Sequence, residues 1–171
     1  MFKKFYFLFI FSCLFISFIS SFSNSLNSNK NSNSYLYPTN TTNISSYFGY
    51  RELFGKQNFH NGIDFPVAKG NPVFATLSGT VIFSNFNSGY GNSIIILHDN
   101  NFKSLYSHLE ENYIVKNGQY INAGQLIGYV GPKYLSNGNL NGWTTGPHLH
   151  FSIFNDKGIA IDPLTLNLIQ K

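Results

Sequence analysis

Two histidines lie one residue apart in a strand-like stretch near the C-terminus. His148 and His150 occur in the sequence PHLHF, inside an apolar run. Successive residues of a strand point to opposite faces of a sheet, so the two imidazoles share one face. Leu149 and Phe151 then point the other way, into the expected core. The pair is either two chance histidines on a solvated face or the imidazole part of a metal or catalytic site.

A second polar cluster lies earlier in the chain, in the sequence FHNGIDFP. His60 and Asp64 are four residues apart, and the Asn61-Gly62 pair between them disfavours a helix. On a straight strand the two would lie about 13 Å apart, too far to bind one ion. A turn at Asn61 and Gly62 would let them converge, and Gly62 supplies the permissive backbone that a tight turn needs. Otherwise Asp64 only caps the turn and His60 is a surface residue.

These side chains together match the chemistry of zinc. Zinc binds nitrogen and oxygen ligands, and a catalytic zinc keeps three protein ligands and an open position for water. His60, Asp64 and one of the paired histidines supply such a set, and the other would lie near the bound water. The spacing does not tell the two apart. His108 and His98 each end a strand-like run; taken alone, both are read as ordinary surface or core histidines.

The elements that must position these side chains are short strands. Runs rich in β-branched and aromatic residues recur along the chain, and Gly, Asn and Pro separate them. No long segment has a helical period, so the pattern predicts an all-β domain with a mostly antiparallel sheet. The expected strands cover residues 72–76, 79–86, 92–98, 103–109, 125–130 and 148–154.

The composition excludes several classes of function. The chain of 171 residues has a net charge of +4, and its basic residues form no stripe. We therefore expect no nucleic-acid binding. Cys13 is the single cysteine, so neither an intrachain disulfide nor a cysteine-based zinc site can form.

Residues 1–23 have the layout of an export signal. Lys3 and Lys4 precede an apolar run, and Ser21 and Ser23 are spaced like the small pair before a signal-peptidase cut. The run is shorter than the roughly 20 residues of a membrane span. An uncleaved N-terminal anchor that tethers the protein to the membrane is the second interpretation.

The segment that follows predicts a linker and then one domain. Residues 24–45 are rich in Asn and Ser and hold little to bury, so we expect a flexible linker. The folded domain is expected at residues 46–171, which is long enough for one core. Such an exported protein would act in the cell envelope, in the periplasm or outside the cell.

Four motifs, in this order, resemble those of the lysostaphin and LytM-type zinc endopeptidases. They are HNGIDF, YSHL, NGQYINAGQLIGYVG and TGPHLHF, with YFGYR before them and DPLTL after them. The resemblance covers residues 47–166, nearly the whole expected domain. It implies a LytM-like antiparallel β-sheet domain with a zinc-bearing groove. It also implies a peptidoglycan substrate that is cut in its stem peptide or cross-bridge.

The resemblance further implies a role for each site residue. His60 and Asp64, from the H-x-x-x-D motif, are expected ligands of one Zn²⁺, and His150, the second histidine of H-x-H, is the third. His108 and His148 are the expected catalytic pair that does not bind the metal. A metal-activated water would then hydrolyse the peptide bond.

One departure from the family pattern is the long loop of residues 132–145, which contains Trp143, the single tryptophan. We expect this loop to influence the choice of substrate and not the metal. The alternatives are a non-catalytic LytM-type regulator of another cell-wall hydrolase, a 2-His-1-carboxylate iron oxygenase, and a metal-free wall-binding module. Such regulators typically lack zinc ligands, and the oxygenases normally carry H-x-D in place of H-x-x-x-D.

Overall fold

The computed structural model describes residues 35–170. The expected export signal or anchor at residues 1–23 and the first part of the expected linker lie outside the described residues. Within the described range, no helix is long and apolar enough to cross a membrane. The helical structure there is one 3-10 turn, η1 (Pro163–Thr165), which Asp162 caps by accepting a hydrogen bond from the Leu164 main-chain N–H.

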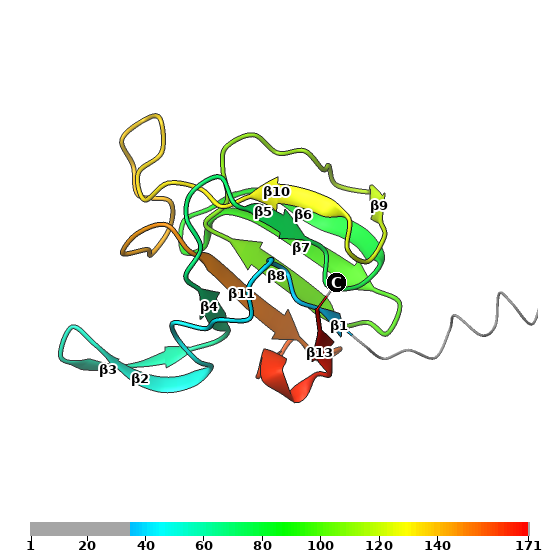
Figure 1. Cartoon of the computed structure of the whole chain (residues 1–171), viewed down its shortest axis with the longest axis horizontal. Coiled ribbons are helices and arrows are strands. Elements are labelled where there is room, and N and C mark those ends of the chain that lie inside the picture. Colours follow the sequence, from blue (N-terminus) through cyan, green and yellow to red (C-terminus); the bar gives the residue numbers. More distant parts are fainter. Residues whose placement is uncertain (1–34, 171) are drawn as a thin grey trace, which may run out of the picture. The chain divides into compact units, whose positions relative to one another are not determined.

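A seven-stranded sheet forms the centre of the domain (Figure 1). Its strands are β4 (Ile63–Phe65), β6 (Gly79–Asn87), β7 (Gly91–His98), β8 (Lys103–Ser107), β9 (Tyr120–Ile121), β11 (Leu149–Phe154) and β12 (Ala160–Ile161). They follow the order β12-β11-β8-β7-β6-β9, and β4 also pairs with β11. Every neighbouring pair runs antiparallel. The expected all-β antiparallel fold is therefore confirmed.

Three two-stranded sheets surround this centre. They are the hairpin of β2 (Gly49–Leu53) and β3 (Lys56–His60), the pair of β5 (Pro72–Phe74) and β10 (Leu126–Tyr129), and the pair of β1 (Tyr35–Leu36) and β13 (Leu168–Ile169). The first two pairs are antiparallel and the third is parallel. Hairpin β2–β3 projects away from the central sheet beside β4 (Figure 1).

Strand β1 falls inside the segment that was expected to be a linker. The Tyr35 side chain is buried, and its hydroxyl accepts a hydrogen bond from Asn100 Nδ2 at 2.8 Å. The Leu36 main-chain N–H donates to the Thr76 carbonyl at 2.8 Å. Because these partners lie far along the chain, the domain as described begins before the expected boundary at residue 46.

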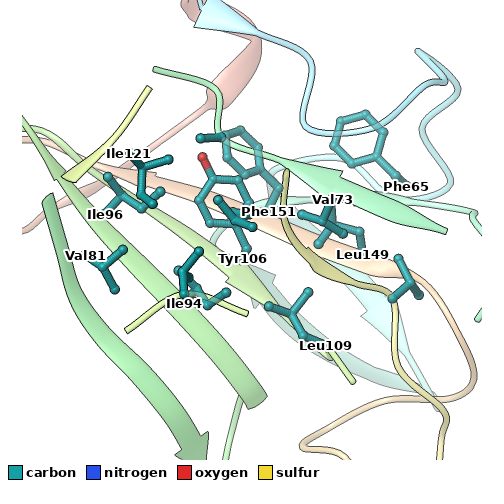
Figure 2. Close-up of a cluster of buried hydrophobic side chains, with 14 of the residues drawn as sticks. Phe65, Val73, Val81, Ile94, Ile96, Tyr106, Leu109, Ile121, Leu149 and Phe151 are labelled. Carbon is teal, nitrogen blue, oxygen red and sulfur yellow. The ribbon is translucent and has the colours of Figure 1, made fainter. Parts of the chain in front are cut away.

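Alternate residues of β11 face a buried apolar core (Figure 2). Leu149 and Phe151 are fully buried, and the Phe151 ring lies 5.4 Å from the Tyr106 ring of β8. His148 and His150 lie on the other face, as the period of two predicts. The core thus fixes which side of β11 carries the imidazoles.

A chain of hydrogen bonds crosses this core. The Tyr106 hydroxyl lies 3.0 Å from both Thr76 Oγ1 and Ser104 Oγ. His98 Nε2 lies 2.9 Å from Ser104 Oγ, and His98 Nδ1 lies 2.9 Å from the Ser78 carbonyl. A carbonyl only accepts, so Nδ1 carries the proton. Burial lowers the pKa of His98, which favours this neutral ring. His98 is therefore a core residue and lies outside the site described next.

Candidate metal centre and its groove

Strands β3, β4 and β11 bring three polar side chains to one point. His60 is the last residue of β3, Asp64 is in the middle of β4, and His150 lies on β11. Asp64 and His150 are direct partners in the antiparallel register, so their side chains leave the same face of the sheet. The chain bends at residues 61–62, and this bend returns His60 to that face.

The ligand-type atoms of these residues lie close together. Asp64 Oδ1 is 3.1 Å from His60 Nε2 and 2.9 Å from His150 Nδ1. The two nitrogens are 3.0 Å apart. All three residues are buried, and at most 8% of the surface of each is exposed. Two imidazole nitrogens and one carboxylate oxygen could hold a metal ion here, and this donor set suits zinc.

The outer nitrogens of both imidazoles already have partners. His60 Nδ1 lies 2.9 Å from the Tyr47 carbonyl, and His150 Nε2 lies 2.8 Å from the Ser152 hydroxyl. Because a carbonyl only accepts, His60 Nδ1 carries the proton and Nε2 keeps its lone pair. Burial lowers the pKa of His150, which favours its neutral form. Metal-binding histidines are usually held in this way, so these residues fit a zinc ion.

Asp64 is held as a carboxylate. Burial alone raises the pKa of Asp64, but its close contacts with His150 and His60 outweigh burial and leave the pKa below its ordinary value. Arg51 Nη1 lies 3.3 Å from the other oxygen, Oδ2, and also donates to the Ser46 hydroxyl. Oδ1 therefore faces the imidazoles and Oδ2 faces the guanidinium. Sequence reasoning gave Arg51 no role, and its only signal was its place in YFGYR.

His108 and His148 form a second pair beside this cluster. Their ring centroids are 4.7 Å apart, and the His108 ring lies 6.1 Å from the His150 ring. His148 Nε2 lies 3.7 Å from Asp64 Oδ1. Burial, together with the nearby His148, lowers the pKa of His108 to about 3. The structure thus gathers all the residues that the resemblance singled out.

Sequence reasoning missed what holds this second pair. His108 Nδ1 donates to the Asn141 carbonyl at 2.7 Å, and His148 Nδ1 donates to the Gly146 carbonyl at 2.9 Å. Both acceptors lie in the segment between β10 and β11. Every residue has a main-chain carbonyl, so the sequence does not reveal which carbonyl will accept from His108. The Asn141-Gly142 pair, which is typical of a turn, is the one signal at this position.

Gly62 is required by close packing. A Cβ on Gly62 would lie 2.4 Å from the Phe151 carbonyl oxygen and 2.8 Å from His150 Cε1. It would also lie 2.5 Å from the Ser152 hydroxyl. The φ angle of Gly62 lies outside the left-handed region, so the expectation of a specially permissive backbone is wrong. The bend simply passes too close to β11 for any side chain at this position.

A cavity of about 400 Å³ opens over the cluster. Phe59 and Leu53 of hairpin β2–β3 line it, and so does Trp143 of the loop before β11, although 86% of Trp143 is exposed. The Tyr90 ring stacks on His150, with centroids 5.7 Å apart. The remaining lining residues are Arg51, Asn58, His60, Asn61, Asp64, Gly89, His108 and His148. The cavity therefore gives a substrate access to all the imidazoles of the site.

Residues 58–163 match the model of Peptidase family M23. The DD-carboxypeptidase/endopeptidase Mpg of Neisseria meningitidis serogroup B is 35% identical over 133 residues, which are 77% of this chain and 28% of that protein. The chain thus spans less than a third of the length of this relative.

Two solved structures are also similar. A zinc-containing peptidase from Vibrio cholerae is 31% identical, with a TM-score of 0.66 over 79% of this chain and 40% of that one. The catalytic domain of the antimicrobial peptidase lysostaphin from Staphylococcus simulans is 31% identical, with a TM-score of 0.60 over 72% of this chain and 90% of that one.

Proposed function

The chain belongs to peptidase family M23, and we propose that it is a zinc-dependent endopeptidase that hydrolyses peptide bonds of peptidoglycan. The observation that carries the proposal is the meeting of His60 Nε2, His150 Nδ1 and Asp64 Oδ1 at one point. Donors of these types and this number are typical of catalytic zinc sites. The similar proteins include a DD-carboxypeptidase/endopeptidase and a zinc-containing peptidase, which supports a peptide substrate and this metal.

In this proposal, His60, Asp64 and His150 would hold one Zn²⁺. When bound, the ion would polarise the scissile carbonyl and lower the pKa of a water from about 15.7 towards 7. Asp64 would contribute Oδ1, because Arg51 engages Oδ2. Arg51 thereby orients the carboxylate and keeps its second oxygen turned away from the imidazoles.

His108 and His148 would move the protons of the reaction. Each ring turns Nδ1 to a main-chain carbonyl, so Nε2 is the atom that remains for the substrate and the water. A neutral ring accepts a proton there, and a protonated ring donates one. Together the pair can take the proton of the attacking water, stabilise the oxyanion and protonate the leaving amine. General acid–base catalysis of this kind contributes about 10²–10⁴ in rate.

The walls of the cavity favour an uncharged stretch of peptide. Among its lining residues, Arg51 and Asp64 are the permanently charged pair, and they face each other. Phe59, Leu53 and Trp143 offer apolar surface to whatever lies beside the scissile bond. Small residues such as alanine or glycine, which are common in peptidoglycan peptides, could pack there without burying an unpaired charge.

Peptidoglycan lies outside the cytoplasmic membrane, so the proposal requires export. Residues 1–23 would direct it, and the mature protein would begin near Asn24 in the cell envelope. N-terminal sequencing of the protein recovered from cells tests this step. An intact Met1 in a membrane fraction would indicate an uncleaved anchor instead.

Digestion of purified peptidoglycan, followed by mass analysis of the fragments, tests the activity. The zinc-loaded full chain should release fragments whose new ends identify the bond that is cut. The Asp64→Ala variant should lose both zinc and fragment release. A wild-type chain that binds zinc but releases no fragment would instead support the non-catalytic regulator. Iron in place of zinc in a metal analysis would favour the oxygenase.

A further inference from the structure

The loop between β10 and β11 (yellow to orange in Figure 1) returns to the site at Asn141. Asn141 has none of its surface exposed, although residues 136–140 just before it are exposed. We propose that Asn141 is a positioning residue for the hydrolysis proposed above, a role that rests on that function. Its main-chain carbonyl holds His108 in the tautomer that leaves Nε2 free for proton transfer.

The contact between the two residues fixes the position of one proton. His108 Nδ1 lies 2.7 Å from the Asn141 carbonyl oxygen. That oxygen only accepts, so Nδ1 must carry the proton. Nε2 of the neutral ring then has a lone pair. Without the Asn141 carbonyl as acceptor, the Nδ1–H tautomer would lose the hydrogen bond that favours it. A neutral ring with its proton on Nε2 could not accept a second proton at Nε2.

The Asn141 side chain anchors its own carbonyl. Oδ1 accepts a hydrogen bond from the Asn92 main-chain N–H at 2.8 Å. Nδ2 donates to the Leu109 carbonyl at 2.9 Å and to the Pro132 carbonyl at 3.2 Å. Asn92 lies on β7 and Leu109 directly follows His108, so these bonds tie the loop to β7 and to the residue next to His108.

Close packing of the next residue supports the same arrangement. Gly142 has a φ of +76°, and a Cβ there would lie 2.4 Å from the Gly91 nitrogen. This position therefore needs glycine both for its backbone and for its contact. The Trp143 main-chain N–H donates to the Gly89 carbonyl at 2.8 Å. The Asn141 carbonyl thus has a fixed residue on its C-terminal side as well.

The main chain of His108 does not by itself set its ring. His108 has a φ of 60°, which is uncommon for a residue other than glycine. Its N–H donates to the Tyr90 carbonyl at 3.0 Å, and its carbonyl accepts from the Gly131 N–H at 2.8 Å. These bonds hold the backbone, and the neighbouring His148 ring, 4.7 Å away, packs against the side chain. Neither contact decides which ring nitrogen carries the proton, and the Nδ1 contact with the Asn141 carbonyl does.

Nitrogen-15 NMR of the full chain at about pH 8, where an ordinary histidine is neutral, reports the tautomers directly. In the wild type, His108 and His148 should both be Nδ1–H, with or without zinc. In Asn141→Ala, His108 should become mixed or Nε2–H, while His148 should not change because Gly146 holds it. The value of kcat should fall about 10–100-fold, as is typical when a supporting partner is lost, with KM and zinc content little changed.

Two further variants keep the test decisive. Asn139→Ala changes an exposed asparagine of the same loop and should behave as the wild type. Asn141→Ser keeps one group that can accept from the Asn92 N–H, so it should give intermediate effects, and it decides the matter if Asn141→Ala does not fold. An unchanged His108 tautomer in folded Asn141→Ala would show that the Asn141 side chain is not needed to place the carbonyl, and would refute the positioning role of Asn141. Lack of wild-type cutting would refute the proposed function, and the spectra would still report on Asn141.

Discussion

A methyl group at position 62 would test how closely the bend between β3 and β4 must approach β11. In Gly62→Ala the new carbon would start 2.4 Å from the Phe151 carbonyl oxygen, where ordinary contacts begin at 3.4 Å. Phe151 cannot yield easily, because β11 is paired with both β4 and β8. The bend must therefore move by about 1 Å, the difference between those two distances. Such a shift would draw His60 and Asp64 away from His150.

The size of the effect follows from this displacement. Overpacking a core costs about 1–3 kcal/mol, and a clash with main-chain atoms belongs at the upper end. Unfolding entropy is about 2.1 cal/mol/K per residue, so about 3 kcal/mol should lower the melting temperature of a domain of roughly 140 residues by about 10 °C. Moving two ligands relative to the third should also weaken zinc binding, by about 10–100-fold.

Thermal unfolding of the zinc-free chain and competition for zinc with a chelator measure the two effects. Gly128→Ala is the matched control, because its Cβ would meet Leu109 Cδ1 at 3.5 Å and Ile94 Cδ1 at 3.7 Å, which are ordinary contacts. Its stability should change by less than about 1 kcal/mol. If Gly62→Ala melts and binds zinc as Gly128→Ala does, the steric argument is wrong.

Three other predictions concern separate parts of the molecule. His108→Ala should keep its zinc, measured by metal analysis, and lose about 10²–10⁴ in kcat on peptidoglycan; an empty metal site would make His108 a ligand instead. Burial lowers the pKa of His98 in the folded chain, so the unfolded chain takes up a proton at a higher pH than the folded chain does. The free energy of unfolding should therefore fall as the pH drops below about 6.5, until the pH reaches the pKa of His98 in the folded chain. Urea unfolding at several pH values should show that the free energy of unfolding of His98→Gln depends less on pH in this range. The same pH dependence in the variant and the wild type would contradict the role given to His98. Trp143→Ala should retain zinc but change which peptidoglycan peptides are cut, judged by mass analysis of the digest; identical fragments and rates would show that Trp143 does not touch the substrate.

The four longer strands of the central sheet, β6, β7, β8 and β11, could be predicted because their cause is local, whereas the short strands β4, β9 and β12 were not predicted. In β11, apolar Leu149 and Phe151 alternate with His148 and His150, and that alternation alone states which side chains share a face. The same reasoning places the two imidazoles together without reference to any other strand. The convergence of His60 and Asp64 could also be predicted, because the sequence between them disfavours a helix and a straight strand would hold them too far apart to bind one ion.

The supports of the site could not be predicted because their causes are distant in the chain. The partner of His108 is the carbonyl of Asn141, a residue 33 positions away, and a carbonyl has no signature in a sequence. Gly62 was correctly suspected of being special, but its reason is the nearness of β11 and not its own turn. Tyr35 was assigned to a linker because its partner, Asn100, is found only once the strands are assembled.

The pairing of β4 with β11 has a consequence for the stability of the protein and its resistance to proteolysis. Asp64 and His150 are 86 residues apart in sequence and meet only when these two strands align in one way. A slip by one residue would turn His150 into the core and present Leu149 or Phe151 to solvent. An ion shared by the two side chains would bind correctly assembled molecules alone, and mass action would then add its binding free energy to their stability. In the proposed zinc-bound form, the supply of zinc would thus control how many molecules resist proteolysis.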